Sequence, residues 1–295
     1  MERHDERPVV VGVDASDSAR AAAVWAGDLA AAWGAPLHLL HAVPGEAPAQ
    51  EAQPAWLREL ADAAENAGAA PSRVEVVPHG TVELLADRAD RARMLVLGSY
   101  GEGAWSGMLA GAVALALAGT VPCPVAVVRG AAPRVAPPRN GPVVVGVDGS
   151  ATGHAAALLA VDVAASVGAP LIAVHAWSDV AESGGGLRRR HDDWAELAEQ
   201  GGAVLAEEIQ AAAEARPALD IRRDLVNDTA LRALLRWADD ARMLVVGHRG
   251  HGLTQGTRLG STSRALVEFA PCPVVVTPPV PAPVAQATHS TNAAR

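Results

Sequence analysis

Short apolar runs alternate with longer helical patterns along most of the chain. The first run, Val9–Val13, is uninterrupted and ends at Asp14. A continuous apolar run of this length is typical of a strand that is buried on both faces, as in a parallel sheet. The Ala-rich segment 18–33 that follows has a helical pattern with a Ser cap candidate at its start, and Gly34, with Pro36 just after it, marks its end. The pattern predicts a strand followed by a helix.

The same alternation continues to residue 128 and predicts five strands separated by four helices. The expected strands cover residues 9–14, 37–43, 73–77, 94–98 and 125–128. The expected helices cover residues 18–33, 54–67, 82–92 and 112–118. Strands that alternate with helices in this way form an open parallel sheet with right-handed crossovers, so we expect a doubly wound α/β fold.

The chain also repeats itself. Pro8–Asp14 returns as Pro142–Asp148 at an offset of 134, and Ala92–Val96 returns as Ala241–Val245 at an offset of 149. The second copy therefore contains 149 − 134 = 15 extra residues. In that region we expect an exposed Gly-rich loop around 183–186 and a longer second helix over 194–214. A repeat of this length indicates two tandem domains.

The domain boundaries follow from the repeat and from the composition around it. We expect a first domain at residues 1–131, a Pro- and Arg-rich linker at 132–141 and a second domain at 142–278. Residues 279–295 are rich in Pro and small polar residues, which predicts a disordered tail.

A glycine-bearing loop lies between the fourth strand and the last helix of each copy. In the second copy it reads Gly247-x2-Gly250-x9-Gly260, followed directly by Ser261 and Thr262. Glycines at positive φ can turn backbone N–H groups toward a ligand, and a helix N-terminus adds unpaired donors and a partial positive charge. The loop therefore predicts an anion site, with phosphate as the expected anion.

The first copy keeps the three glycines, Gly98, Gly101 and Gly111, but Ala112 stands where the second copy has Ser261. The loop charges differ as well. Residues 98–120 contain no Arg or His and one acid, whereas residues 247–267 contain three Arg and two His and no acid. We therefore predict strong triphosphate binding in the second copy and weak or absent binding in the first.

Composition excludes several classes of function. The formal net charge of −9 argues against a general nucleic-acid binder. The chain has no lysine, so neither a Walker-type phosphate site nor a lysine Schiff base is possible. No zinc-type cluster and no nucleophile–base–acid set stands at a recognisable spacing, so we expect no enzyme, or at most a slow ATPase. The sequence shows no signal peptide and no apolar stretch of ~18 residues, which predicts a cytoplasmic protein without a membrane span.

Several single residues have ordinary structural interpretations. We expect Cys123 and Cys272 to be small buried hydrophobes and His41 and His175 to be ordinary strand-end residues. Trp105, inside the first glycine loop, would either reshape that crevice or simply pack. Arg188–Arg190 with Asp192 and Asp193 predict a solvated loop.

The full spacing of the second loop, with Val143–Asp148 and Pro271–Val274 around it, resembles the signature of ATP-binding universal stress proteins. The resemblance covers both copies. It implies a Rossmann-like five-stranded parallel sheet in the order 3-2-1-4-5 in each domain. In that order a crevice opens between the carboxyl ends of strands 1 and 4, and Asp148 and Gly247 would both face it.

The resemblance also implies roles for individual residues. Asp148 would line the nucleotide site, and the backbone near Val174 and His175 would meet the base. The phosphates, with Mg²⁺, would be held by Gly247, Gly250, Gly260, Ser261 and Thr262. Asp14, with Gly98, Gly101 and Gly111, would form the counterpart in the first copy. Asp14 and Asp148 have an alternative interpretation, as caps of the turns that follow them.

The resemblance leaves three functions open. The preferred one is an ATP-binding regulator in a stress response; the others are an ATPase or nucleotidyl-transfer enzyme and a scaffold that binds no nucleotide. AMP or a cyclic nucleotide could replace ATP as the ligand. The last strand of each copy is an expected sheet edge, which would be protected by pairing between copies or between chains. We expect a homodimer through these edges.

Overall fold

The structure is a computed structural model of the 295-residue chain, and it describes residues 6–43, 45, 53–101, 110–132, 134–177, 192–250 and 259–279. The expected loop at 183–186, the Arg188–Arg190 cluster, Trp105 and residues 280–295 of the expected tail lie outside these ranges.

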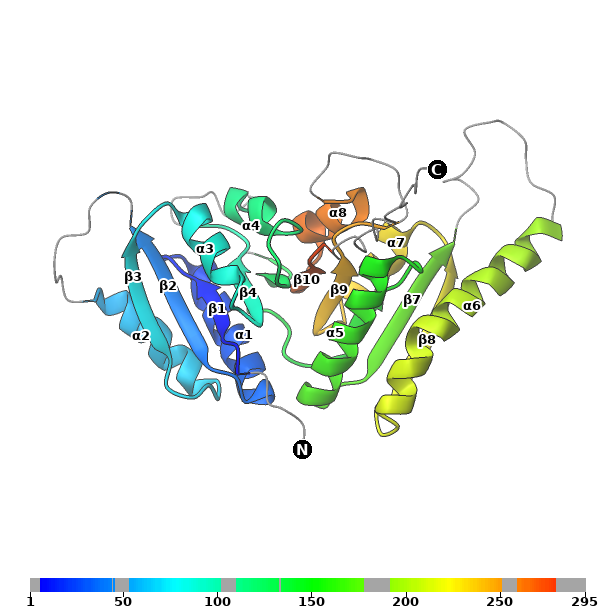
Figure 1. Ribbon diagram of the computed structural model, residues 1–295, viewed down its shortest axis with the longest axis horizontal. Coiled ribbons are helices and arrows are strands. Elements are labelled where there is room, and N and C mark those ends of the chain that lie inside the picture. The colour runs from blue at the N-terminus through cyan, green and yellow to red at the C-terminus, as the bar shows by residue number, and fades with distance from the viewer. Residues whose placement is uncertain are drawn as a thin grey trace, which may run out of the picture.

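The described residues form two successive α/β units with the same order of elements (Figure 1). The strands are β1 (Val9–Gly12), β2 (Leu37–Val43), β3 (Arg73–Pro78), β4 (Met94–Gly98), β5 (Val125–Val128), β6 (Val143–Gly146), β7 (Leu171–Trp177), β8 (Ile221–Asn227), β9 (Met243–Gly247) and β10 (Val274–Thr277). The helices are α1 (Asp17–Trp33), α2 (Ala55–Asn66), α3 (Thr81–Ala89), α4 (Ala112–Leu117), α5 (Ala151–Val167), α6 (Asp192–Ala215), α7 (Ala230–Ala238) and α8 (Ser261–Phe269).

The ends of α1 show why the sequence pattern predicts these elements well. The helix begins at Asp17, one residue earlier than expected, because Ser16 is the N-cap and its hydroxyl accepts the Ala19 N–H at 3.1 Å. It ends at Gly34, whose φ of 60° is the left-handed conformation expected of a C-terminal glycine. The longer second helix of the second copy is confirmed as α6.

The two copies share a single ten-stranded sheet. Its order is β3-β2-β1-β4-β5-β10-β9-β6-β7-β8, so each copy has the expected 3-2-1-4-5 order. All neighbouring strands are parallel except β5 and β10, which pair antiparallel with Val275 opposite Ala126. Both last-strand edges are therefore occupied within one chain. The predicted pairing of these edges between two chains is therefore wrong. A second chain would have to bind at another surface.

Helices cover both faces of this sheet. One buried apolar cluster packs α1, α2, α5 and α6 against one face, and the other packs α3, α4, α7 and α8 against the opposite face. The central strands are buried on both sides, which explains their continuous apolar sequences.

Charged contacts also join the two copies. Arg93, after α3, forms an ion pair with Asp162 on α5 at 2.9 Å, and its guanidinium lies 4.0 Å from the centre of the Trp33 ring. The repeat places Arg242 and Asp28 at the reciprocal positions. Arg242 interacts electrostatically with Asp28, which also forms an ion pair with Arg139. The junction therefore has an approximate two-fold symmetry.

Of the helices within the described ranges, none has the length and apolar character needed to span a membrane.

Candidate functional site

A cavity of about 110 Å³ opens at the carboxyl ends of β6 and β9, where the strand order of the second copy reverses. Ligands bind at such switch points in open α/β sheets. The lining residues come from β6 and its turn, α5, β7, α7, the loop after β9 and the start of α8: Gly146, Val147, Asp148, Gly153, Val174, Ala176, Ala230, Leu234, Val246, Gly247, Arg249, Gly250, Thr262 and Ser263.

Five of the predicted site residues line this cavity: Asp148, Val174, Gly247, Gly250 and Thr262. Gly260 and Ser261 are not part of the lining; they form the N-cap and the first residue of α8 beside it. The structure therefore gathers the predicted residues of the second copy around one crevice.

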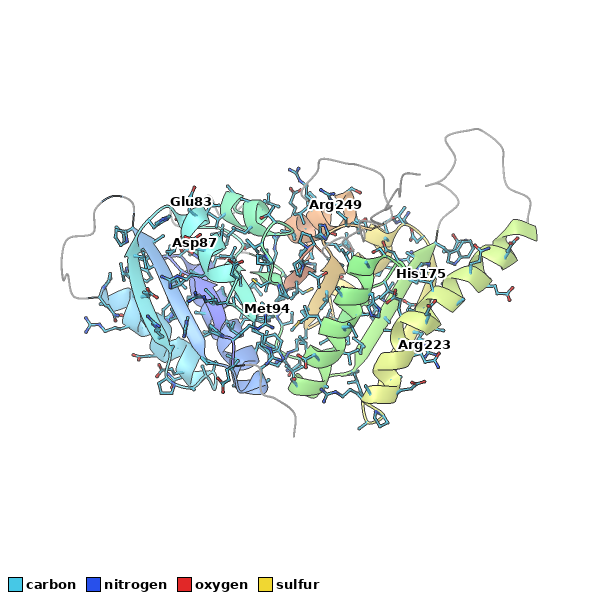
Figure 2. The ribbon with its side chains drawn as sticks, viewed as in Figure 1. Glu83, Asp87, Met94, His175, Arg223 and Arg249 are labelled. Atoms are coloured by element: carbon cyan, nitrogen blue, oxygen red, sulfur yellow. The ribbon has the colours of Figure 1, made fainter. Side chains whose placement is uncertain are left out.

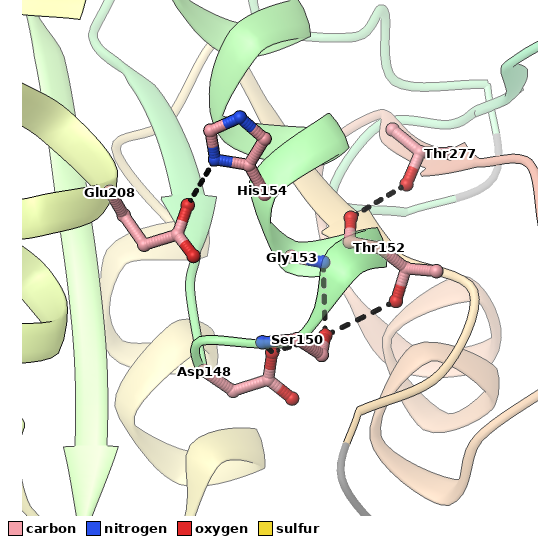
Figure 3. A network of polar contacts seen from close by, with 7 residues as sticks. All are labelled: Asp148, Ser150, Thr152, Gly153, His154, Glu208 and Thr277. Atoms are coloured by element: carbon pink, nitrogen blue, oxygen red, sulfur yellow. Dashed lines mark hydrogen bonds and ion pairs between the residues drawn. The ribbon is translucent and has the colours of Figure 1, made fainter. Parts of the chain in front are cut away.

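Asp148 uses its two carboxylate oxygens differently. Its Oδ1 accepts the Ser150 N–H at 3.0 Å and the Ser150 hydroxyl at 2.6 Å, and Ser150 in turn caps α5 by accepting the Gly153 N–H (Figure 3). Its Oδ2 points toward the glycine loop, because a Cβ added to Gly250 would lie 2.2 Å from that oxygen. One carboxylate oxygen therefore organises the turn while the other faces the crevice.

Four of the signature glycines, Gly98, Gly101, Gly247 and Gly250, permit a close approach, whereas an added Cβ on Gly111 or Gly260 would meet no atom closer than 3.4 Å. None of the six has a positive φ, so that expectation is wrong. A Cβ on Gly247 would lie 2.7 Å from Thr152 Oγ1 and 3.0 Å from the Thr152 carbonyl carbon, and a Cβ on Gly98 would meet Ser18 in the same way. The first glycine of each loop thus lets a strand end lie directly against the start of the helix that follows strand 1.

One edge of the crevice is formed by the loop after β9 and the start of α8. The Ser263 hydroxyl donates to the Gly247 carbonyl at 2.6 Å, and the Gly260 N–H donates to the His248 carbonyl at 2.8 Å. No side chain caps the N-terminus of α8. The first turn of a helix leaves its N–H groups without intrahelical acceptors, so these donors are available to an anion.

Arg249 adds a full positive charge to this edge (Figure 2). Its Nε is buried and has no hydrogen-bond partner within the described part of the chain. A buried guanidinium donor without an acceptor is unfavourable unless an anion pairs with it. The neighbouring His248 is buried as well, and burial, followed by the charge of Arg249, lowers the pKa of its imidazole.

The opposite edge of the crevice is apolar. Val174 in the middle of β7 and Leu234 on α7 both line the crevice, as do Ala176 and Ala230. His175 is not part of this lining. Its Nδ1 donates to the Val147 carbonyl at 2.8 Å and so joins β7 to the turn after β6. His41 makes the same contact with the Val13 carbonyl at 2.9 Å, so the corresponding histidine of each copy joins the second strand to the turn after the first.

The first copy has the same framework with different chemistry. The Asp14 carboxylate accepts from Ser16, and a Cβ on Gly101 would lie 2.9 Å from Asp14 Oδ2. Gly111 begins α4 as Gly260 begins α8. Tyr100 stands where the second copy has Arg249, however, and Ala112 stands where it has Ser261. Most of the first loop, residues 102–109, lies outside the described residues, as do residues 251–258 of the second loop.

Nine of the lining residues are not among the predicted site residues, and three of them matter for the chemistry of the crevice. Leu234 and Ala230 reach the crevice from α7, a helix that no motif connects to the loop. Arg249 was counted as loop charge and not as a site residue, although its place between Gly247 and Gly250 was a usable signal. Among the residues that the structure describes, no group of three His, Cys, Asp or Glu side chains could hold a metal ion.

The cysteines behave as predicted. Cys123 and Cys272 are free and buried, and burial raises the pKa of their thiols to about 11 and about 12 respectively. They serve as small core residues.

Comparison with known proteins agrees with the fold. The model of the universal stress protein family matches residues 6–129 and 140–278. The universal stress protein Rv2623 of Mycobacterium tuberculosis (strain H37Rv) is 32% identical over 286 residues, which cover 91% of this chain and 95% of that protein. The universal stress protein Rv2005c of the same strain is 34% identical over 286 residues, covering 91% of this chain and 96% of that protein.

Solved structures show the same architecture at lower identity. A universal stress protein from Archaeoglobus fulgidus DSM 4304 matches with a TM-score of 0.59 and 19% identity, covering 92% of this chain and 98% of the other. A putative universal stress protein from Pseudomonas aeruginosa matches with a TM-score of 0.61 and 17% identity, covering 92% of each chain. These two structures support the fold alone.

Proposed function

The chain belongs to the universal stress protein family, and from this premise we propose that it is a nucleotide-responsive regulator that binds ATP in its second copy. One observation carries the proposal. The crevice between β6 and β9 has a cationic edge with free helix donors at one end and an apolar edge at the other. An adenine nucleotide has two ends that complement these edges: anionic phosphates and an uncharged aromatic base.

The proposed pose follows from that match. The phosphates lie against Arg249 and the start of α8, near Gly250, Gly260, Ser261 and Thr262. The base lies between Val174 and Leu234, where an uncharged aromatic ring buries apolar surface. The enclosed volume of about 110 Å³ is below the range of roughly 300–1,000 Å³ typical of ligand pockets. A nucleotide would therefore extend from the enclosed part toward the loop that follows Gly250.

Mg²⁺ fits this pose as a companion of the phosphates. Asp148 is the one carboxylate among the residues that line the cavity, and its Oδ2 faces the glycine loop. Magnesium in nucleotide sites is usually bound through one or two carboxylates, the phosphate oxygens and water. Asp148 would supply the protein ligand, and the ion would offset the charge of the phosphates.

Gly250→Ala is a direct test, because its new Cβ would displace the Asp148 carboxylate without touching backbone. We expect the affinity of the full chain for Mg-ATP, measured by isothermal titration calorimetry, to fall at least about tenfold. Gly101→Ala is the matched control in the first copy and should leave the affinity unchanged. Equal losses in both variants would overturn the assignment to the second copy.

The ligand itself is identified by mass spectrometry of the nucleotide released from purified protein. ATP, AMP and a cyclic nucleotide should then be titrated separately. Tighter binding of AMP or the cyclic nucleotide would replace ATP in the proposal. The absence of binding by all three would favour a scaffold function, and rapid release of ADP or AMP from bound ATP would favour an enzyme.

A further inference from the structure

A second and larger cavity, of about 660 Å³, lies in the first copy on the side of the sheet covered by α1. Its walls come from α1, the residues that follow β4, the end of β5, and the segment 129–139 that connects the copies. The volume lies within the range of roughly 300–1,000 Å³ that small-molecule sites occupy. The cavity is therefore large enough for an organic molecule.

This cavity is distinct from the nucleotide crevice. The repeat gives a first-copy counterpart for each residue that lines the crevice, and among the described residues Tyr100 is the one counterpart that also lines the large cavity. The crevice lining includes residues of α7 and α8, whereas the lining of the large cavity includes none from α3 or α4, their first-copy equivalents. The large cavity is therefore a separate space and not the first-copy version of the crevice.

The connecting segment forms a folded wall of this cavity. The Val135 N–H donates to the Ala132 carbonyl at 3.1 Å, which closes a turn in which Arg134 has a φ of 63°. A Cβ on Gly130 would lie 2.1 Å from the Val135 carbonyl oxygen, so Gly130 permits this close return. The segment therefore returns on itself beside α1.

Four arginines line the cavity, and each of them already has a partner. Three form ion pairs with acids of α1 and α2: Arg134 with Asp17, Arg139 with Asp28, and Arg20 with Glu59. The fourth, Arg129, donates to the Glu268 carbonyl at the end of α8. A charged ligand would have to compete with these contacts and lose its own hydration, so the lining favours an uncharged ligand.

Most of the uncharged lining is apolar. Ala21, Val24 and the buried Trp25 belong to α1, Val128 ends β5, and Pro137 lies on the connecting segment. An uncharged molecule placed against these side chains buries apolar surface. A flat aromatic ring gains further where it packs beside an indole. The lining therefore favours an apolar or aromatic body.

Two buried hydroxyl groups also line the cavity. Ser18 on α1 is 5% exposed and Ser99 after β4 is 4% exposed, and their Oγ atoms lie 3.4 Å apart. The Ser18 Oγ also accepts the Tyr100 N–H at 3.3 Å. Neither hydroxyl has a further hydrogen-bond partner within the part of the chain that the structure describes. Whichever serine donates to the other, one hydroxyl proton is therefore left without an acceptor, and a ligand oxygen would satisfy it.

In the second copy the equivalent hydroxyl is used within the protein. Thr152 stands at the position of Ser18, and its hydroxyl donates to the Arg249 carbonyl. In the first copy the corresponding carbonyl, that of Tyr100, accepts from the Ser16 hydroxyl at 3.4 Å instead. The donor that faces the cavity is therefore particular to the first copy.

The space itself is also particular to the first copy. His248, buried and bulky, stands where the first copy has Ser99. Thr277 replaces Val128, and its hydroxyl donates to the Thr152 carbonyl at 3.2 Å, which ties the end of β10 to α5 (Figure 3). The cavity therefore belongs to the first copy and the connecting segment, and not to the repeated fold.

We propose that this cavity binds an uncharged, mainly apolar molecule that carries one hydrogen-bond acceptor, of the class of aromatic ketones. The apolar body packs against Val24 and Trp25 on α1. The acceptor oxygen takes the free proton of the two hydroxyls, Ser18 and Ser99. The arginines keep their present partners.

The test uses a neutral fluorescent ketone, 6-propionyl-2-(dimethylamino)naphthalene, whose emission shifts to the blue in an apolar site. We expect it to bind the full chain at one site. Three competitors then compare the acceptor group: 2-acetylnaphthalene, 2-isopropenylnaphthalene, which has a methylene in place of the carbonyl oxygen, and the anion 2-naphthoate. The ketone should compete roughly fivefold more strongly than the alkene, because it accepts one more hydrogen bond. It should also compete more strongly than the anion.

Each competitor can overturn one part of the proposal. Equal competition by the ketone and the alkene would show that no hydroxyl donates to the ligand. Stronger competition by 2-naphthoate than by the ketone would show that the site prefers an anion.

Removing both hydroxyls tests the assigned donor. In the double variant Ser18→Ala with Ser99→Ala, the preference for the ketone over the alkene should fall from roughly fivefold to about onefold, while the affinity for the alkene stays unchanged. The ratio of the two competitors does not depend on a general loss of packing. A preference that survives in the double variant would overturn the assignment to these serines.

Bulky substitutions locate the site. Ala21→Trp places an indole in the cavity and should weaken binding of the fluorescent ketone at least about tenfold. Ala155→Trp, at the repeat position on α5, is the matched control and should have no effect. Ala131→Trp is a second variant on the connecting segment, where Ala131 is exposed and its replacement does not disturb the core. It should weaken binding as well.

Saturating Mg-ATP and the Gly250→Ala variant should both leave probe binding unchanged, so this test does not depend on the proposed nucleotide function. Competition by ATP would show that the probe occupies the nucleotide crevice and would overturn the proposal. Unchanged binding in both Ala21→Trp and Ala131→Trp would do the same.

Discussion

The two copies share one sheet order and differ in where they leave space. The second copy has its cavity beside α7 and α8, with Arg249 and the start of α8 on its edge. The first has its larger cavity beside α1, under the segment that connects the copies. A few side chains account for the difference: Arg249 against Tyr100, Ser261 against Ala112, and His248 against Ser99.

The comparison teaches that duplication preserves the scaffold more strictly than the site. Asp14 and Asp148 organise the same turn, and His41 and His175 make the same backbone contact, because both sets of bonds hold the framework together. The side chains at the phosphate-facing positions take no part in these framework bonds, and they differ between the two copies. Fold and ligand chemistry are therefore separable within one chain.

The largest effect should come from exchanging the phosphate-facing residues between copies. Arg249→Tyr combined with Ser261→Ala gives the second crevice the side chains of the first. Each lost hydrogen bond to a charged phosphate is worth about 1.5–3 kcal/mol, so the affinity for Mg-ATP should fall roughly 100-fold or more. Calorimetry on the full chain measures this change.

The reverse exchange, Tyr100→Arg with Ala112→Ser, completes that comparison. If these two positions account for the difference between the copies, the full chain should gain a second, weaker ATP equivalent. A stoichiometry that stays at one after the reverse exchange would show that these two positions do not account for the difference between the copies.

The sequence predicted the architecture because the responsible signals are local and occur twice. Apolar runs, the glycine stop at Gly34 and the internal repeat specify strands, helix ends and copy boundaries without any knowledge of the fold. The sequence does not decide whether the last strands pair between copies or between chains. An exposed sheet edge needs a partner strand, but either chain could supply it; in the structure β5 pairs with β10 of the same chain.

The site was only partly predictable. The motif found the residues contributed by the turn after strand 1 and by the glycine loop, because each of these two segments carries its own local sequence signal. Leu234 reaches the crevice from a helix that carries no motif, and its position depends on how α7 packs on the sheet. The contacts between the connecting segment and α1 were also not predicted. A Pro- and Arg-rich sequence is typical of a linker, and its ion pairs with Asp17 and Asp28 depend on how the chain folds.

The contacts between copies should respond unequally to matched substitutions. Arg93→Gln removes both the ion pair with Asp162 and the contact with the Trp33 ring. The Arg93 side chain is 15% exposed, so we expect a loss of about 2 kcal/mol of unfolding free energy, measured by urea titration. Arg242→Gln should cost less, because Asp28 keeps its ion pair with Arg139. A larger loss for Arg242→Gln would contradict this ranking.

Two glycines in helices should respond with opposite signs. A Cβ on Gly27 in α1 would lie 2.5 Å from the Ala64 carbonyl oxygen of α2, so Gly27→Ala forces these helices apart. We expect a net loss of about 1 kcal/mol, because overpacking outweighs the gain in helix propensity. Gly202 in α6 has open space, with Leu225 Cδ2 at 4.0 Å. Gly202→Ala should therefore stabilise the protein by about 0.5–1 kcal/mol. Thermal unfolding of both variants shows whether each substitution raises or lowers the stability. If both raise it, α1 and α2 can move apart at no cost.

The smallest effect should be a pH dependence that belongs to the second copy. Burial, and then the charge of Arg249, lowers the pKa of His248 below its ordinary value of 6.5. The unfolded chain therefore binds a proton at this residue at a higher pH than the folded chain does. Between the lowered pKa and 6.5 the unfolded state holds more protons, so stability rises with pH in that window and falls as the pH drops below 6.5.

His248→Gln removes this contribution while keeping a polar side chain of similar size, and urea titrations above and below pH 6.5 should show a shallower loss of stability in acid. His38, whose pKa is also lowered by burial, is present in both proteins and cancels in the difference. An unchanged slope would show that His248 gains a proton in the folded state as easily as in the unfolded one.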